Sequence, residues 1–270
     1  STQLVLHALH LQHDIGPAYG QAKLTSDEKQ AVLALIQRRV IERIPACYLT
    51  GNAWFASLNF KSDKRALVPR SPIAELIESG FEPWLGDLQV ERALDLCTGS
   101  GCIAIAMAHY NPDWQVDGVD ISAEALSLAN ENKDRLYATN CEFIESDLFN
   151  GVQGKVYDLI VTNPPYSDYN RFLAHSFSLA DNIVLLVPVA KMFKSMGTMS
   201  DIFNYGGFVE IHTLPSSKAG FPFGFPSAVY YLKRDYKGET KIKMLDGITF
   251  EGRKKRKEKD LGAGTLFETE

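Results

Sequence analysis

The sequence predicts an α/β fold, in which helices cover both faces of a parallel sheet, preceded by a small helical N-terminal domain. From residue 92 onward, short buried apolar runs alternate with segments of helical period, which is the pattern of βαβ units. Before that point the chain is predicted to be helical and then to form a short hairpin. Its 270 residues, 45% hydrophobic and 23% charged, suffice for one or two domains and exclude the disordered, collagen-like and coiled-coil classes.

The N-terminal part contains one well-marked helix. Residues 21–43 carry apolar side chains at helical spacing, and Thr25 with Glu28 has the sequence of a capping box. Strand-like pieces at 54–55 and 58–60 predict a hairpin, and a further helix is expected just after Pro72. We expect a helical and hairpin domain at residues 1–66, the sheet domain at 67–250, and a basic, flexible tail at 251–270.

The sheet domain is predicted from alternating elements. Strands are expected at 93–97, 115–119, 141–144, 157–161, 183–187, 208–213 and 228–233, and helices at 101–109, 123–135, 172–180 and near 193–203. The last two strands are expected to form an antiparallel hairpin. Because ligands of such folds bind at the carboxyl ends of the strands, the functional residues are sought there.

A glycine-containing turn follows the first of these strands. Gly99 and Gly101 stand where the backbone must approach a ligand closely and where positive φ is often needed. The spacing Gly99-x-Gly101-x-x-Ala104 is also tolerated by dinucleotide-binding proteins, so the turn alone leaves an NAD-type site and a turn without any ligand open.

Carboxylates follow the next two strands. Asp120 comes about 20 residues after the glycines, where a carboxylate can bind a ribose diol. The alternative for Asp120 is a helix N-cap, a role that Ser122 would fill better. Asp147 is placed to accept from an adenine amino group, with Leu148 or Phe149 covering the ring, although an aspartate in a surface turn would look similar.

The segment Asn163–Tyr166, with sequence Asn-Pro-Pro-Tyr, follows the fourth strand and is the most specific motif. Consecutive prolines fix the backbone and remove two donors, which leaves carbonyls free to accept. The Asn163 amide oxygen and the Pro164 carbonyl can then accept from one planar amino group, against which Tyr166 can stack. Such a site orients a weak nucleophile toward an electrophilic methyl group without a strong base.

These motifs together resemble the PrmB/HemK family of protein-(glutamine-N5) methyltransferases. The resemblance is carried by Leu67–Pro72, Leu94–Ala106, Val119–Ser122, Ser146–Phe149 and Tyr157–Tyr166 and covers roughly residues 20–166. Arg43–Thr50, followed by Ala53–Phe55, points to the PrmB branch, which modifies a glutamine of a large-subunit ribosomal protein.

The resemblance implies a class I methyltransferase fold with a Rossmann-like, seven-stranded sheet, S-adenosyl-L-methionine (SAM) as cofactor, and a substrate-recognition role for residues 1–66. It implies that the cofactor is bound by Pro69, Arg70, Asp95, Thr98, Gly99, Gly101, Asp120, Ile121, Asp147, Leu148 and Asn163. Within this set, Pro69 and Arg70 would line the site around the methionine part of SAM. It further implies that Asn163, Pro164, Pro165 and Tyr166 form the catalytic segment that holds the glutamine amide.

Beyond Tyr166 the sequence departs from that family, since its acidic, Glu-Pro-containing loop and its Gly-x-Asp-Gly segment are missing. Residues 167–172, 185–188 and 219–226 instead look similar to adenine-N6 DNA methyltransferases, as if two halves joined at Asn-Pro-Pro-Tyr. An adenine-N6 methyltransferase acting on DNA or RNA and a non-catalytic SAM-binding module are therefore kept as alternatives.

The remaining features bear on partners and location. Phe221, Phe223 and Phe225 could stack on a flipped base or simply pack against the sheet. The basic run 253–259 could contact phosphates or remain solvated. A net charge of −5 favours a protein acceptor over nucleic acid. No metal site is predicted from the histidines and the four scattered cysteines, and the absence of a long apolar run or secretory signature favours a cytoplasmic protein without a membrane segment.

Overall fold

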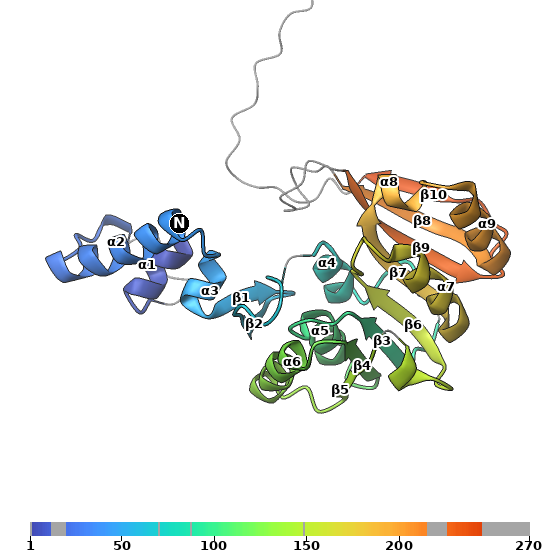
Figure 1. The fold of residues 1–270 in the computed structure, drawn as a ribbon, viewed down its shortest axis with the longest axis horizontal. Helices are drawn as coiled ribbons and strands as arrows, with labels where there is room; N and C mark the ends of the chain where they lie inside the picture. The colour runs from blue at the N-terminus through green and yellow to red at the C-terminus, as the bar shows by residue number, and fades with distance from the viewer. Residues whose placement is uncertain are drawn as a thin grey trace, which may run out of the picture.

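The computed structural model describes residues 2–11, 20–69, 71–86, 88–147, 149–214 and 226–244. Figure 1 shows a small helical N-terminal lobe and a sheet domain, with a two-stranded hairpin between them. Within the described residues, no helix is long and apolar enough to cross a membrane.

The N-terminal lobe contains α1 (Thr2–Ala8), α2 (Ser26–Ile41) and α3 (Ala46–Thr50). The predicted capping box is confirmed, because the Glu28 amide donates to the Thr25 hydroxyl at 3.3 Å and the Thr25 amide donates to the Glu28 carboxylate at 2.7 Å. The predicted hairpin is confirmed as β1 (Asn52–Phe55) paired antiparallel with β2 (Leu58–Lys61). Helix α1 was not predicted.

The predicted α/β fold is confirmed, with strands in the order β10-β8-β9-β7-β6-β3-β4-β5. The strands are β3 (Arg92–Leu96), β4 (Gln115–Asp120), β5 (Cys141–Glu145), β6 (Tyr157–Thr162), β7 (Ala180–Pro188), β8 (Gly206–Leu214), β9 (Ser227–Arg234) and β10 (Lys241–Met244). Strands β3 to β7 run parallel, and β9 is antiparallel to both β7 and β8.

Seven of these strands form the expected sheet, and β10 adds an eighth at its edge, parallel to β8. All four residues of β10 are exposed. Its sequence, Lys-Ile-Lys-Met, alternates polar and apolar residues over only four positions, which is the shortest run that indicates a strand. This explains why residues 241–244 were not predicted to form a strand.

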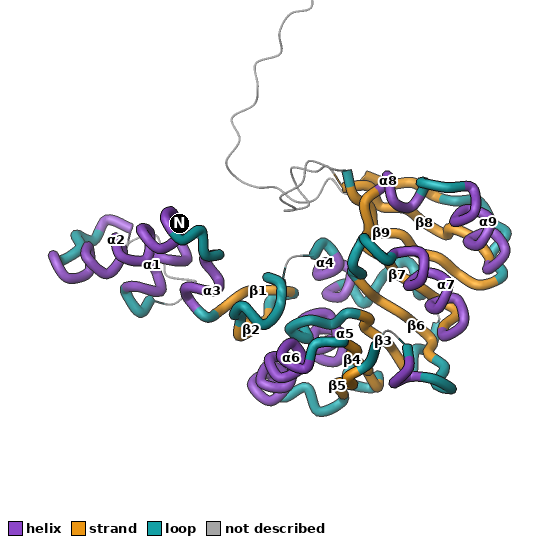
Figure 2. Tube along the Cα trace, in the orientation of Figure 1, coloured by secondary structure: helices purple, strands orange, loops and turns teal. Residues whose placement is uncertain are grey.

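Helices lie on both faces of the sheet (Figure 2). They are α4 (Ile73–Glu78), α5 (Cys102–Tyr110) and α6 (Ala123–Leu136) on one face, and α7 (Tyr169–Leu179), α8 (Val189–Met192) and α9 (Met196–Tyr205) on the other, with a 3₁₀ turn, η2, at Asn150–Val152. Successive side chains of β7 alternate between the two cores: Val184 packs with α4 and α5, and Leu185 packs with α7 and α9. This alternation is the period-2 geometry of a strand that is buried on both faces.

The helix predicted near 193–203 is confirmed as α9, which begins three residues later, at Met196. Ser195 sets this start, because its hydroxyl accepts from the Thr198 amide at 3.1 Å and so caps α9. Helix α8 ends before the predicted start and was not predicted.

Candidate functional site

The turn between β3 and α5 is built from residues with left-handed backbone. Cys97, Gly99 and Gly101 have φ values of 59°, 56° and 79°. A Cβ atom built on Gly101 would lie 2.7 Å from the Phe143 ring, so a side chain here would clash as well as being strained. Gly101 thus lets α5 approach β5 closely, and Gly99 leaves its backbone open toward the carboxyl edge of the sheet.

Asp95 braces this turn from inside the sheet domain. It is 1% exposed, and one carboxylate oxygen accepts from the Thr98 hydroxyl at 2.6 Å and from the Ala104 amide at 3.2 Å. Burial raises the pKa of Asp95 to about 8, against the lowering effect of these two hydrogen bonds. Its other oxygen has no hydrogen-bond partner, and neither has the buried Ser100 hydroxyl.

Asp120 joins the ends of β3 and β4. One of its carboxylate oxygens accepts from the Gly99 amide at 2.9 Å, and the other accepts from the Ser122 amide at 3.0 Å. Each oxygen keeps a free lone pair that could accept from a diol hydroxyl. The predicted alternative, capping of α6, is filled by Ser122, whose hydroxyl accepts from the Ala125 amide at 3.1 Å.

Two other predicted cofactor residues flank Asp120. Ile121 directly follows Asp120 and is 68% exposed. Asp147 is exposed, and its neighbour Ser146 donates its amide to the Asp120 carbonyl at 3.0 Å. The ends of β4 and β5 are therefore adjacent, with Asp147 one residue beyond the contact.

Asn163–Tyr166 lies at the carboxyl end of β6, the strand on the opposite side of β3 from β4. The Thr162 hydroxyl donates to the Leu96 carbonyl at 2.5 Å, which ties the end of β6 to the end of β3. Pro164 is buried and Pro165 is exposed. Asn163 directly follows Thr162, so this bond to β3 also holds Asn163 near the glycine turn.

Tyr166 contacts Asn163 directly. Its hydroxyl donates to the Asn163 amide oxygen at 3.3 Å. Burial raises the pKa of Tyr166 to about 12, so the phenol remains protonated at neutral pH and serves as a donor, not as a base. The thiol of Cys102, whose pKa burial raises to about 12, is likewise not an ionised nucleophile at this edge.

The structure brings together most of the predicted residues that it describes. They lie in the last two residues of the adjacent strands β4, β3 and β6 or in the loops that follow them: Asp95, Thr98, Gly99, Gly101, Asp120, Ile121, Asn163 and Tyr166. Pro69 is buried in the segment that leads from the hairpin to α4, and no hydrogen bond links it to the others. Arg70 and Leu148 fall outside the described residues, as do the aromatic loop at 221–225 and the basic run 253–259.

Three residues of the site were not predicted: Ser100, Thr162 and Asn132. Ser100 and Thr162 lie directly beside predicted residues, and their adjacency to the glycines and to Asn163 was the available signal. Asn132 lies inside α6 and donates to the Ser100 carbonyl at 3.0 Å. Nothing in the local sequence marks an asparagine in a polar helix as a contact of the glycine turn. Among the described residues, no group of three or more His, Cys, Asp or Glu side chains could hold a metal ion.

Comparison with known proteins gives a methyltransferase match over the same region. The family model described as the methyltransferase small domain matches residues 80–189. The fold is shared with a Listeria monocytogenes protein assigned provisionally to the class I S-adenosylmethionine-dependent methyltransferases, whose crystal structure has a TM-score of 0.56 and 14% identity and covers 92% of this chain and 84% of that one. The sheet domain thus has the predicted class I methyltransferase fold.

Two sequence relatives are much more similar. The ribosomal protein uL3 glutamine methyltransferase of Xanthomonas campestris pv. campestris is 74% identical over 166 residues, which are 62% of this chain and 54% of that protein. The protein of the same name from Neisseria gonorrhoeae is 51% identical over 167 residues, 61% of this chain and 56% of its own length. The predicted resemblance is confirmed, and the chain spans about half the length of these curated relatives.

Proposed function

We propose that this protein is a SAM-dependent N-methyltransferase that modifies a glutamine side-chain amide of a large-subunit ribosomal protein, uL3. The observation that carries the proposal is the junction of β3 and β6. There the glycine turn, with Asp120 bonded to Gly99 at 2.9 Å, lies beside Asn163, which follows the Thr162 bond to Leu96. The two named relatives supply the acceptor, since both are glutamine methyltransferases of uL3.

The described residues at the carboxyl edge fit a SAM molecule. Two buried polar atoms, Asp95 Oδ1 and Ser100 Oγ, have no hydrogen-bond partner, and a bound ligand would relieve the cost of leaving them unsatisfied. The Asp120 oxygens have lone pairs left for a ribose, and the exposed Ile121 offers an apolar surface to a flat ring. When bound, SAM supplies an electrophilic methyl group on a sulfonium.

The catalytic contribution of the chain is orientation. In this proposal the Asn163 amide oxygen and the Pro164 carbonyl accept the two N–H groups of the substrate amide, which turns its nitrogen toward the methyl donor. Tyr166 donates to Asn163 at 3.3 Å and so fixes which face of that side chain is presented. Neither an ionised thiol nor a tyrosinate is available here at neutral pH, so positioning takes the place of a strong base.

The N-terminal lobe is proposed to recognise the protein substrate. It is joined to the sheet domain by the β1–β2 hairpin (Figure 1), so an acceptor bound to it could reach the carboxyl edge. In this proposal residues 1–66 form the recognition domain, residues 67–250 the methyltransferase domain and residues 251–270 a basic tail. Activity on a ribosomal protein would place the enzyme in the cytoplasm.

The acceptor class can be tested by supplying both candidate substrates. The protein is incubated with SAM carrying a labelled methyl group and either purified uL3 or unmethylated DNA, and the products are digested and separated by mass spectrometry. The proposal expects label on a glutamine side chain of uL3. Label on adenine alone would contradict it and would support an adenine-N6 methyltransferase, which shares the use of Asn-Pro-Pro-Tyr to hold a planar amino group. SAM binding without transfer to either acceptor would support a non-catalytic module.

A further inference from the structure

Asn132 uses its whole amide to join two segments that are distant in the sequence. It lies on α6 and is 0% exposed. Its Nδ2 donates to the Ser100 carbonyl of the glycine turn at 3.0 Å and to the Lys61 carbonyl of β2 at 3.2 Å, and its Oδ1 accepts from the Lys61 amide at 2.7 Å. One buried side chain thus connects the β1–β2 hairpin to the glycine turn.

We infer that Asn132 is a positioning residue. It holds the glycine turn in the conformation that binds SAM, and it couples the β1–β2 hairpin to the cofactor site. This inference rests on the proposed function, because it concerns the affinity of the site for the proposed cofactor. Asn132 would touch neither SAM nor the acceptor, and it acts through the Ser100 carbonyl and the Lys61 backbone.

The segment that follows β2 is held against the same turn by further contacts. The Tyr48 hydroxyl, from α3, donates to the Ala66 carbonyl at 2.7 Å. A Cβ atom built on Gly99 would lie 3.9 Å from Ala66 Cβ, so Ala66 lies beside the glycine turn. Residues 61–66 therefore contact the glycine turn at both ends, through Asn132 at Lys61 and directly at Ala66.

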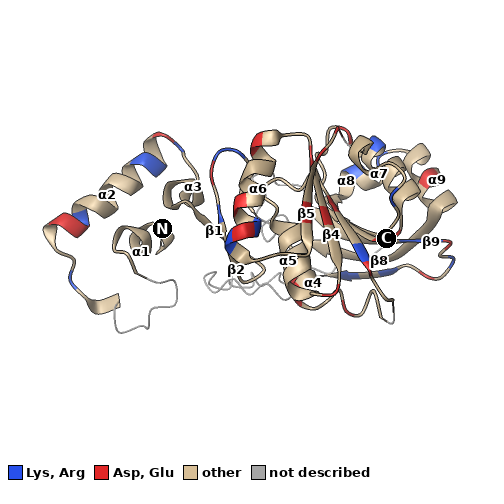
Figure 3. Ribbon diagram, turned by 90° about the horizontal axis from the view of Figure 1, so that it is seen from below, with Lys and Arg blue, Asp and Glu red and all other residues tan. Residues whose placement is uncertain are grey.

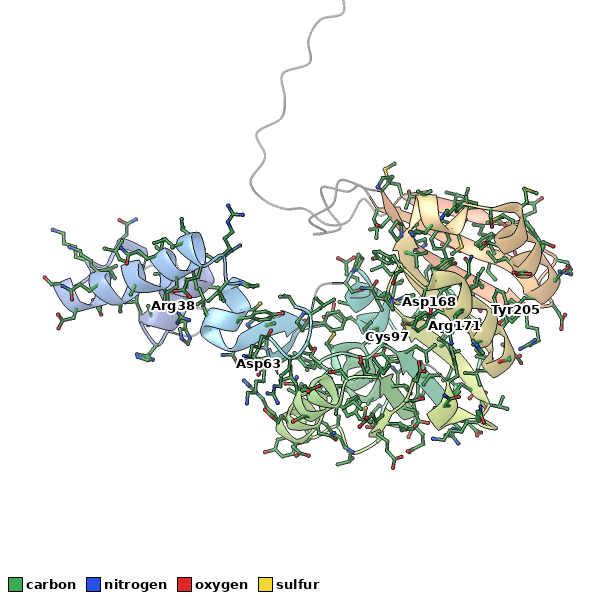
Figure 4. The ribbon with its side chains drawn as sticks, in the orientation of Figure 1. Arg38, Asp63, Cys97, Asp168, Arg171 and Tyr205 are labelled. Atoms are coloured by element: carbon green, nitrogen blue, oxygen red, sulfur yellow. The ribbon has the colours of Figure 1, made fainter. Side chains whose placement is uncertain are left out.

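Charged side chains secure the outside of this junction. Arg65 bonds to Asp63 at 2.7 Å and to Glu131 at 2.6 Å, and Lys61 bonds to Glu131 at 2.5 Å. Asp63 lies on the hairpin side of the junction (Figure 4). These ion pairs are partly exposed and are screened by solvent and salt. Asn132 differs from them because its side chain is fully buried, and so is its bond to the Ser100 carbonyl.

Loss of the amide should therefore move the turn. Without Asn132 Nδ2, the buried Ser100 carbonyl and the Lys61 carbonyl each have one donor fewer. Buried backbone groups are rarely left unpaired. The turn and the hairpin are expected to shift until water or another group pairs these atoms, and a shifted turn no longer matches the cofactor.

The test compares Asn132→Asp with Asn130→Asp in the 270-residue chain. Aspartate at 132 keeps an acceptor for the Lys61 amide but loses both N–H donors. Asn130 is a matched control, because it is exposed on the same helix and its amide bonds only within α6, to the Leu126 carbonyl at 2.9 Å. Binding of S-adenosylhomocysteine is measured by calorimetry, and the KM for SAM and kcat are measured with uL3.

We expect Asn132→Asp to raise the dissociation constant for S-adenosylhomocysteine and the KM for SAM by about tenfold or more, with kcat changed by less than about threefold. Asn130→Asp should change each value by less than about twofold. A folded Asn132→Asp protein with wild-type affinity would overturn the inference alone. Wild-type protein that fails to bind S-adenosylhomocysteine would contradict the proposed function and this inference with it.

A second measurement needs no variant, in case Asn132→Asp does not fold. Hydrogen exchange of the wild-type protein is followed with and without S-adenosylhomocysteine. Coupling through Asn132 predicts that the ligand slows exchange of the Lys61 amide, which bonds to Asn132 and lies outside the proposed cofactor contacts. Unchanged exchange at Lys61, together with slowed exchange at Gly99, would overturn the inference.

Discussion

At the scale of single residues, Asp95 shows how burial sets chemistry at the candidate site. Burial raises its pKa to about 8, with hydrogen bonds from Thr98 and Ala104 opposing the rise and the charge of Asp120 adding to it. The unfolded chain releases this proton near an ordinary aspartate pKa of about 4. Between these two values the folded protein binds more protons than the unfolded chain, so the stabilisation that protonated Asp95 provides is lost as pH rises.

Substitution Asp95→Asn should remove this pH dependence from the ligand-free protein. The free energy of unfolding of the wild type, relative to Asp95→Asn, is expected to fall between about pH 4 and pH 8, with a slope of up to about 1.4 kcal/mol per pH unit. Urea denaturation at a series of pH values measures the difference. Parallel stability curves for the two proteins would show that Asp95 is ionised in the folded state.

Tyr166 allows a second test at this scale. Tyr166→Phe removes the hydroxyl that donates to Asn163 at 3.3 Å and keeps the ring. We expect the methyl-transfer rate to fall by about tenfold, because one positioning hydrogen bond is lost, while SAM affinity stays unchanged. Tyr137→Phe is the control, since Tyr137 is 86% exposed. Equal effects of the two substitutions on the rate would contradict the role given to the Tyr166 hydroxyl.

At the scale of elements, the junction of β3 and α5 depends on close packing of a turn against β5. Gly101 and Gly154 have nearly the same φ, 79° and 76°, but differ in surroundings. A Cβ on Gly101 would meet the Phe143 ring at 2.7 Å, whereas a Cβ on Gly154 meets nothing within 4 Å. The pair therefore separates the cost of strained backbone from the cost of overpacking.

We expect Gly154→Ala to destabilise the protein by about 1 kcal/mol, the cost of a positive φ. Gly101→Ala should cost roughly 1–3 kcal/mol more, because the Phe143 ring must move. Thermal unfolding measures both, and Phe143→Leu combined with Gly101→Ala should recover part of the extra loss. Equal destabilisation by the two glycine substitutions would contradict the packing that is described for this junction.

The elements that could be predicted from the sequence are those with a buried face. Strands β3, β6 and β7 are buried on both sides and form apolar runs, and α2 begins with a complete capping box. Strand β10 is exposed at every residue, and its alternation of polar and apolar residues covers only four positions. At the site, residues next to strand ends were predictable because strand ends converge. Asn132 was not, because its partner Lys61 is 71 residues away and only the fold brings them together.

At the scale of the whole molecule, charged side chains contribute to joining the N-terminal lobe to the sheet domain. Residues of both signs occur on both parts (Figure 3). Hydrogen bonds from Arg65 and Lys61 hold the pKa of Glu131 down at about 2. Since this pKa is lowered on folding, its stabilising effect is present above about pH 4.5 and is lost as pH falls toward 2.

Because these ion pairs are partly exposed, Glu131→Gln is expected to destabilise the protein by only about 0.2–1 kcal/mol at low salt. The difference from the wild type should shrink in 1 M NaCl, where the screening length is about 3 Å. Urea denaturation at both salt concentrations measures it. A loss of unfolding free energy that is several times larger and insensitive to salt would mean that Glu131, and not Asn132, is the main contact between the hairpin and the sheet domain.

In the proposed function, Asn163 orients the acceptor amide beside the cofactor, and it contributes more to methyl transfer than to SAM binding. The most direct measurement is single-turnover transfer of a labelled methyl group to uL3 by wild-type protein and by Asn163→Ala, with SAM binding measured in parallel. We expect Asn163→Ala to lower the transfer rate by about 100-fold or more, because the acceptor is no longer held in line, and to raise the SAM dissociation constant by about tenfold at most. An unchanged rate of transfer to the uL3 glutamine in Asn163→Ala would contradict it.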